Sequence, residues 1–94
     1  MQTFKVQGKK KKHKILLYAI STCGWCKRTK KFLKDNDVEF EYIDIDRSSS
    51  EDKQEARKDI QNRGGLLAYP TIIIDDKILL TGASMDRLRE VLEV

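Results

Sequence analysis

The stretch ILLYAISTCGWCKRTKKFL, residues 15–33, joins a strand-like segment to a helix-like segment through a pair of cysteines. Residues 15–20 form a continuous apolar run, which is typical of a strand covered on both faces. From 26 to 33, apolar side chains recur at helical spacing with lysines between them. Cys23 and Cys26 are the only cysteines of the chain, and this pattern predicts that they lie at a turn from strand to helix.

Two thiols separated by two residues at such a turn suit reversible disulfide chemistry. Only a thiolate attacks a disulfide, and an ordinary cysteine has a pKa of ~8.5. Lowering the pKa of Cys23 by about two units needs roughly 2.7 kcal/mol, whereas a helix N-terminus supplies at most ~2 kcal/mol. We therefore expect backbone N–H groups of residues 24–26 to supply the rest. Lys27 is the nearest cation and is expected to add a screened contribution to the stabilisation of the Cys23 thiolate. Gly24 loosens the first turn slightly compared with a proline.

Cys26 lies one helical turn further on, so we expect it to keep a higher pKa and to react second. A permanent disulfide or an inert buried thiol is the alternative, but such disulfides are uncommon in a reducing cytosol.

Zinc or an iron–sulfur cluster usually needs four ligands, and the chain offers two cysteines and His13. His13 is ~20 Å from the turn at the rise of a strand. A cluster shared by two chains stays open as an alternative.

The composition favours a small globular protein. The 94 residues carry a net charge of +4 and predict a single domain. No apolar run reaches the ~18 residues of a membrane span, and the first residues do not resemble a secretory signal, so we expect a cytoplasmic protein without a membrane partner. Four lysines at 9–12 could contact phosphates, but only Phe4 and Tyr18 lie near them and no nucleic-acid motif surrounds them. We interpret this run as a solvated loop.

The remaining pattern predicts the order β-α-β-α-β-β-α, with a four-stranded mixed sheet and helices on both faces, an α/β fold. Residues 38–45 alternate as a strand, and serines and acids open a helix at about 50–63. Two strands flank Asp75–Lys77, a turn follows at Gly82–Ala83–Ser84, and a closing helix contains Met85, Leu88, Val91 and Leu92. Residues 1–14 form a basic extension. Its segment Phe4–Val6 finds no free partner beside 15–20, so we expect it at an outer edge or partly mobile.

Three motifs together resemble the glutaredoxin family of thioredoxin-like fold, over roughly residues 15–93. They are Cys23–Gly24–Trp25–Cys26, Tyr69–Pro70–Thr71, and Thr81–Gly82 with Asp86. The last motif is most similar to that of glutaredoxin-like redoxins. The resemblance implies a monomeric oxidoreductase that reduces protein disulfides, with no tightly bound cofactor and with electrons from glutathione or from a reductase. Ile20 replaces a lysine that is usual in glutathione-binding members, which favours a reductase.

The resemblance also implies roles for single residues. Cys23 would be the exposed nucleophile and Cys26 the shielded resolving thiol. Pro70 would follow a cis peptide bond opposite the cysteines, and Tyr69 would offer its backbone to a substrate peptide. Substrate contacts would also come from Trp25, Gly82 and Asp86.

Overall fold

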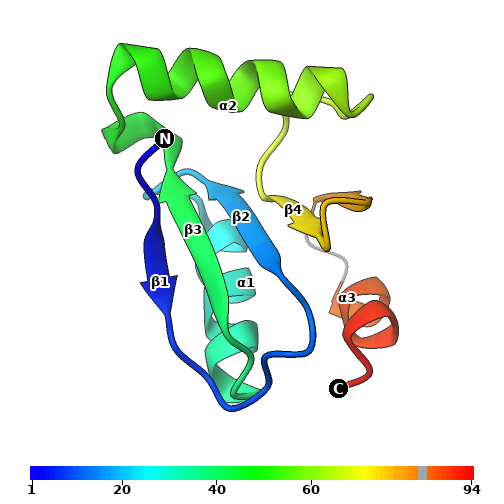
Figure 1. Ribbon diagram of the computed structural model, residues 1–94. Helices are drawn as coiled ribbons and strands as arrows, with labels where there is room; N and C mark the ends of the chain where they lie inside the picture. Colours follow the sequence, from blue (N-terminus) through cyan, green and yellow to red (C-terminus); the bar gives the residue numbers. More distant parts are fainter. Residues whose placement is uncertain (83–84) are drawn as a thin grey trace.

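The computed structural model describes residues 1–82 and 85–94 of the chain. The elements are β1 (Phe4–Val6), β2 (Ile15–Ala19), α1 (Gly24–Asp35), β3 (Phe40–Asp44), a short 3-10 helix η1 (Ile45–Arg47), α2 (Ser50–Asn62), β4 (Thr71–Ile74), β5 (Ile78–Thr81) and α3 (Met85–Leu92). They form one mixed sheet in the order β1-β3-β2-β4-β5 (Figure 1). Strand β2 is parallel to β3 and antiparallel to β4. The predicted α/β, thioredoxin-like class is therefore confirmed.

The prediction of four strands was wrong, because β1 adds a fifth strand to the sheet. It pairs antiparallel with β3 in a register that sets Phe4 opposite Tyr42, and the two rings stack with centroids 5.5 Å apart. Without β1, the outer edge of β3 would have unpaired backbone groups, and such an edge accepts a further strand readily. Of the two alternatives for this segment, the outer edge is the one found.

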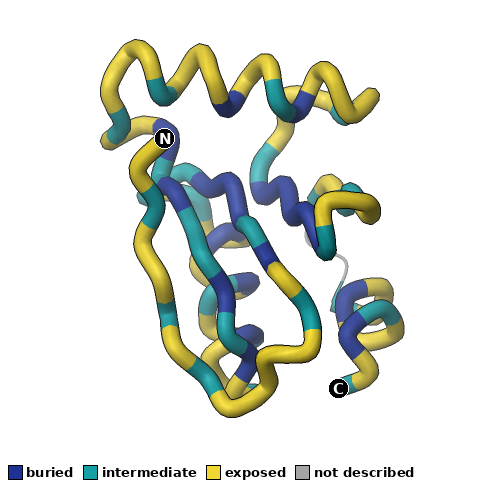
Figure 2. Tube along the Cα trace, in the orientation of Figure 1, coloured by how far each residue is buried: buried dark blue, intermediate teal, exposed yellow. Residues whose placement is uncertain are grey.

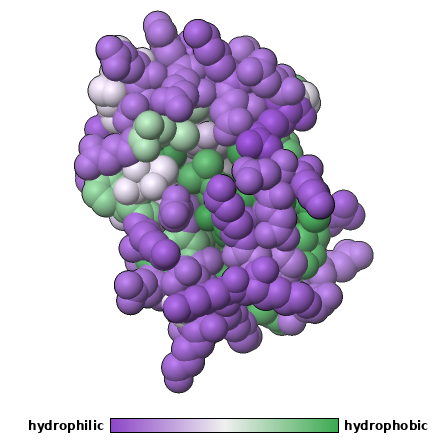
Figure 3. Space-filling view, in the orientation of Figure 1, coloured by the Kyte–Doolittle hydropathy of each residue, from purple (hydrophilic) through white to green (hydrophobic). Residues whose placement is uncertain are grey.

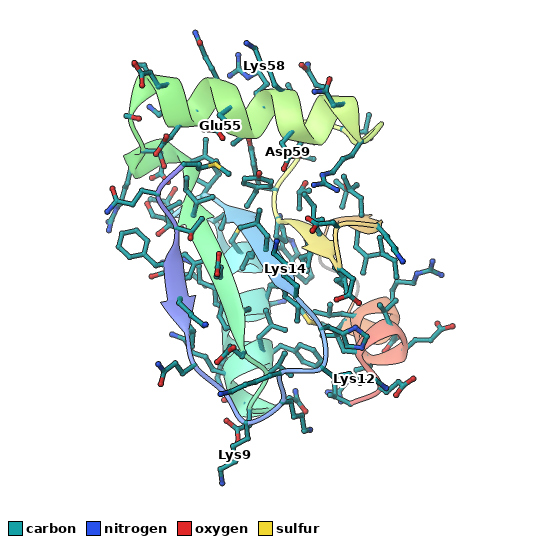
Figure 4. The ribbon with its side chains drawn as sticks, in the orientation of Figure 1. Lys9, Lys12, Lys14, Glu55, Lys58 and Asp59 are labelled. Carbon is teal, nitrogen blue, oxygen red and sulfur yellow. The ribbon has the colours of Figure 1, made fainter. Side chains whose placement is uncertain are left out.

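Gly8 allows the extension to run close to the chain that enters β3. A Cβ at this position would lie 2.6 Å from the carbonyl oxygen of Asp37 and 2.7 Å from the amide nitrogen of Glu39. Beyond it, the amide of Lys10 donates to the carbonyl of Asp37, and the amide of Glu39 donates to the carbonyl of Lys10. The four lysines at 9–12 are exposed, and Figure 4 shows Lys9 pointing away from the body of the molecule.

Helices cover both faces of the sheet, as expected, and each face has its own core (Figure 2). On one face, α1 and α3 pack against β2, β3 and β4 through buried residues that include Leu17, Leu33, Ile72 and Leu88. On the other face, α2 packs through Ala56 and Ile60 against a smaller cluster that includes Tyr18, Ile43 and Ile73. The alternating side chains of β2 thus contribute to two cores.

The second core contains a polar contact between β2 and α2. The hydroxyl of Tyr18 donates to a carboxylate oxygen of Asp59 at 2.5 Å, and Arg63 donates to the other oxygen at 2.8 Å. Figure 4 shows Asp59 on the side of α2 that faces the sheet, whereas Lys58 points outward. On the face seen in Figure 3, hydrophobic side chains are visible mainly below α2, within a largely hydrophilic surface.

The ends of the elements follow their local chemistry. Ser49 caps α2, because its hydroxyl accepts from the amide of Asp52 at 3.1 Å, which confirms the predicted capping. Gly64 has a positive φ of 77° just after this helix. The predicted strand at 38–45 is shorter, since Ile45 already begins the 3-10 helix. Of the predicted turn at 82–84, only Gly82 lies within the described residues, and it has a φ of 87°.

Among the described residues, no helix is long and apolar enough to cross a membrane.

Candidate active site

The two cysteines lie where β2 leads into α1, as predicted. After β2 the chain turns at residues 20–23, where the amide of Cys23 donates to the carbonyl of Ile20 at 3.1 Å. Cys23 is the N-cap of α1, with extended backbone angles, and Cys26 lies in the first turn of the helix. Both are free thiols; Cys23 is partly exposed, whereas Cys26 is completely buried. The arrangement presents one sulfur to solvent and shields the other.

Hydrogen bonds lower the pKa of the Cys23 thiol. The strongest cause is a hydrogen bond from the Cys26 thiol, and the backbone N–H groups of Cys26 and Trp25 lower the pKa further, against partial burial that raises it. The Cys26 amide lies 3.3 Å from the Cys23 sulfur. Free N–H groups at a helix N-terminus stabilise an anion in this way. Of the N–H groups of residues 24–26 that were expected to contribute, those of Trp25 and Cys26 act on the Cys23 sulfur. Lys27 is exposed and is not among the causes.

Burial raises the pKa of the Cys26 thiol to about 12, and the hydrogen bond to Cys23 raises it as well. The backbone N–H of Ile20, which donates to the Cys26 sulfur at 3.5 Å, acts in the opposite direction, as does the charge of Lys30. The pKa of the Cys26 thiol is therefore higher than that of the Cys23 thiol, as was expected. Of the two thiols, Cys23 therefore loses its proton first.

Pro70 lies at the same end of the sheet as the cysteines, and the peptide bond between Tyr69 and Pro70 is cis, as predicted. Thr71, the next residue, pairs with Tyr18 of β2, two residues before Ile20. Tyr69 and Cys23 both pack against the same core cluster. Within the part of the chain that the structure describes, no hydrogen bond involves the backbone of Tyr69. No described residue therefore occupies its N–H and C=O groups.

Trp25 is exposed beside Cys23, with 54% of its surface accessible. The guanidinium of Arg28, one turn further along α1, lies 4.8 Å from the centroid of its ring, which is within the range of a cation–π contact. A Cβ on Gly24 would meet no atom within 4 Å, so the surface in front of the motif is open on this side. The described surface beside Cys23 therefore carries a large exposed aromatic ring.

Gly82 and Asp86 lie on either side of the undescribed residues 83–84. The amide of Gly82 donates to the carbonyl of Pro70 at 2.8 Å, which joins this segment to the cis-proline loop. Asp86 is exposed in the first turn of α3. Gly82 is thus linked to the loop beside the cysteines.

The prediction from sequence did not include some residues that lie around the cysteines. The amide and hydroxyl of Ser21 both donate to Asp46, which tethers the loop before Cys23 and lowers the pKa of that carboxyl. Lys30 forms an ion pair with Asp44, the last residue of β3. Lys30 has a sequence signal, because it follows Cys26 by four residues and so shares a helix face with it.

His13 lies at the other end of β2, as expected. Its Nδ1 is 2.7 Å from a carboxylate oxygen of Asp75, in the turn between β4 and β5. Among residues 1–82 and 85–94, no group of three or more His, Cys, Asp or Glu side chains is arranged to hold a metal ion.

Comparisons with known proteins agree with this geometry. A family model described as glutaredoxin matches residues 15–79. A protein of Clostridium pasteurianum, named an uncharacterized glutaredoxin-like 8.6 kDa protein in the rubredoxin operon, is 31% identical over 78 residues, which cover 81% of this chain and 97% of that protein. Glutaredoxin 1 of Rickettsia felis is 31% identical over 64 residues, which cover 68% of this chain and 60% of that protein.

Solved structures show the same similarity. A glutaredoxin from Methanosarcina mazei has a TM-score of 0.88 and 33% identity, and the match covers 100% of this chain and 90% of that one. Methanoredoxin from Methanosarcina acetivorans has a TM-score of 0.81 and 38% identity, with 86% and 85% of the two chains covered.

Proposed function

This chain belongs to the glutaredoxin family, and we propose that it is a dithiol–disulfide oxidoreductase that reduces protein disulfides through a reversible Cys23–Cys26 disulfide. A redox function follows from the family. The dithiol mechanism is supported by one observation above all. Cys23 and Cys26 are one helical turn apart, and their pKa values are shifted in opposite directions. Burial and the hydrogen bond to Cys23 raise the pKa of Cys26, whereas hydrogen bonds from Cys26 and Trp25 lower the pKa of Cys23.

In the first step, the Cys23 thiolate attacks one sulfur of a substrate disulfide. A bond forms between Cys23 and that sulfur, the substrate S–S bond breaks, and the other substrate sulfur leaves as a thiolate that takes a proton from solvent. The N–H groups of Cys26 and Trp25 support this step, because they stabilise the attacking thiolate at neutral pH. Partial exposure of Cys23 lets a protein disulfide reach it.

In the second step, the Cys26 thiol loses its proton to solvent and attacks the Cys23 sulfur. The Cys23–Cys26 disulfide forms, the mixed disulfide breaks, and the second substrate thiol is released. Two electrons have then passed from the protein dithiol to the substrate. Cys26 reacts only in this intramolecular step, because it is buried and keeps its proton when no mixed disulfide is present.

Substrate binding would use the open face around the motif. The unpaired backbone groups of Tyr69 can form strand-like hydrogen bonds with an extended substrate segment. Trp25 offers an exposed ring for stacking, and its position beside Cys23 places that contact at the reacting disulfide. Gly82 and Asp86 would border the same segment from the side of α3.

The protein would act as a monomer in the cytoplasm without a tightly bound cofactor, and its disulfide would be reduced by glutathione or by a reductase of the thioredoxin-reductase type. Ile20, where glutathione-binding members usually carry a lysine, favours the reductase. The side chain of Ile20 packs against the core on the α2 side, so this position offers no charge to a glutathione carboxylate.

A turnover assay with insulin as substrate tests this function. The protein is supplied either with glutathione and glutathione reductase or with a thioredoxin-reductase-type enzyme, and NADPH consumption is followed. Turnover in at least one system, abolished by Cys23→Ser, is the expected result. A Cys23→Ser variant with full dithiol turnover, or a protein that is isolated anaerobically as an iron-containing coloured dimer without activity, would contradict the proposal.

A further inference from the structure

Lys30 and Asp44 form a charge pair that the mechanism above does not use. The Nζ of Lys30 lies 2.8 Å from a carboxylate oxygen of Asp44, and the side chains are only 18% and 14% exposed. The same Nζ lies 4.2 Å from the centroid of the Tyr42 ring. Lys30 is thus fixed between two groups of β3.

Lys30 lies on the same face of α1 as the buried Cys26. Lys30 follows Cys26 by four residues, and side chains with this spacing are neighbours on one helix face. Figure 1 shows α1 lying behind β2 and β3. Asp44 pairs in register with Ala19. The next residue, Ile20, donates its backbone amide to the Cys26 sulfur. Helix geometry and sheet register therefore both place the pair on the same side of the sheet as this sulfur.

Stability alone gives little reason for this arrangement. Removing two charges from water is costly, and apolar residues of similar size often replace a buried ion pair without loss of stability. An anchored ammonium near a buried thiol has a different effect, because it favours the thiolate form of that thiol. That form is the one Cys26 must reach in the second step of the proposed mechanism.

We propose that Lys30, held in place by Asp44 and Tyr42, is a positioning residue that supplies positive charge to the Cys26 thiolate when it attacks the mixed disulfide. This inference rests on the proposed function. In the described part of the chain, the other groups that act on Cys26 are Cys23 at the N-cap of the same helix and the Ile20 amide in the preceding loop. Asp46 is bound to Ser21, and Asp86 is exposed on α3. The positive charge of Lys30 lowers the pKa of Cys26, which is the direction that the proposal requires.

A reaction with dithionitrobenzoate separates the two steps. Attack by Cys23 releases a first coloured thionitrobenzoate and leaves a mixed disulfide, and attack by Cys26 on that disulfide releases a second. In stopped-flow measurements, Lys30→Gln should slow the second release by roughly three- to tenfold at neutral pH, because loss of thiolate outweighs the gain in nucleophilicity. It should leave the first release nearly unchanged and shift the pH profile of the second release to higher pH.

Two further variants distinguish charge from packing. Lys30→Arg keeps the cation and should restore the second release, whereas Lys30→Met keeps the length of the side chain without its charge and should slow the second release as Lys30→Gln does. Lys31→Gln is the matched control, because Lys31 pairs with Asp35 on the exposed side of the same helix. The inference is overturned if Lys30→Gln leaves the second release unchanged, if it slows both releases equally, or if Lys30→Arg slows the second release as much as Lys30→Gln does. If the wild-type protein shows no second release, the proposed resolving role of Cys26 fails instead.

Discussion

The backbone N–H of Cys26 points at the sulfur of Cys23 from 3.3 Å, so the residue that carries the second thiol also stabilises the thiolate of the first. The Cys26 thiol adds a hydrogen bond to the same sulfur and keeps its own proton in doing so. The order of the two chemical steps thus follows from one helical turn: the exposed sulfur is ionised first, and the buried sulfur reacts only when a mixed disulfide has formed beside it.

Trp25 provides the first prediction. We expect Trp25→Ala to raise KM for insulin about five- to tenfold, which corresponds to ~1–1.4 kcal/mol of lost contact, with little change in the pKa of Cys23. Steady-state kinetics and the pH dependence of Cys23 alkylation measure the two quantities. Phe4→Ala is a suitable control, since Phe4 is equally exposed at 54% but lies at the far edge of the sheet. Equal KM values for both variants would argue against a substrate contact at Trp25.

The stability of the reduced protein should fall at alkaline pH because of Cys26. In the unfolded chain its thiol ionises near ~8.5, whereas in the folded protein it keeps its proton up to about 12. The contribution of the protonated Cys26 thiol to the free energy of unfolding is therefore complete below pH ~8.5. It is lost as the pH rises towards the pKa of Cys26 in the folded protein. By pH 10, this loss should approach about 2 kcal/mol.

Urea unfolding of Cys23→Ser and of Cys23→Ser/Cys26→Ala between pH 7 and pH 10 isolates this effect, because both proteins keep Tyr18, whose pKa is also raised by burial. The difference in the free energy of unfolding between them should shrink with rising pH. A difference that stays constant over this range would show that Cys26 is not held protonated.

Gly8 should be required for the fifth strand. In Gly8→Ala the new methyl group would overlap backbone atoms of residues 37–39, so we expect either displacement of β1 or a loss of about 1–3 kcal/mol in stability. Hydrogen exchange of the amides of residues 4–6 reports on the first outcome and urea unfolding on the second. Gly24→Ala, whose Cβ would meet nothing within 4 Å, should cause no loss. Unchanged exchange and stability in Gly8→Ala would refute the close approach.

The core of the fold could be predicted from local patterns. The apolar run at 15–20, the helical spacing after Cys26 and the serines before Glu51 each depend on neighbours in sequence, and all three elements are found. The partner of Phe4–Val6 could not be predicted in the same way. A three-residue strand gains its stability from the edge that it joins, and here that depends on Gly8 and on the ring of Tyr42 far along the chain.

The charged residues that act on the cysteines also could not be predicted from their neighbours in sequence alone. Lys27 adjoins Cys26 in sequence and was expected to act on Cys23, but in the helix it points to solvent. Lys30 acts on Cys26 because Asp44 and Tyr42 hold it in place, and both come from a strand more than ten residues later. The spacing of four residues indicates a shared helix face, but it does not indicate the carboxylate that fixes the ammonium there.

The most direct test of the two thiol roles is trapping of the mixed disulfide, followed by intact mass spectrometry. Cys26→Ser and Cys23→Ser are each incubated with insulin after reduction and removal of the reductant, and each variant is the matched control of the other. Cys26→Ser should accumulate a covalent adduct on Cys23 that dithiothreitol reverses, whereas Cys23→Ser should form almost none, because its remaining thiol is buried and protonated. Adducts of equal yield on both variants, or an adduct on Cys26 alone, would contradict the assignment of Cys23 as nucleophile and Cys26 as resolving thiol.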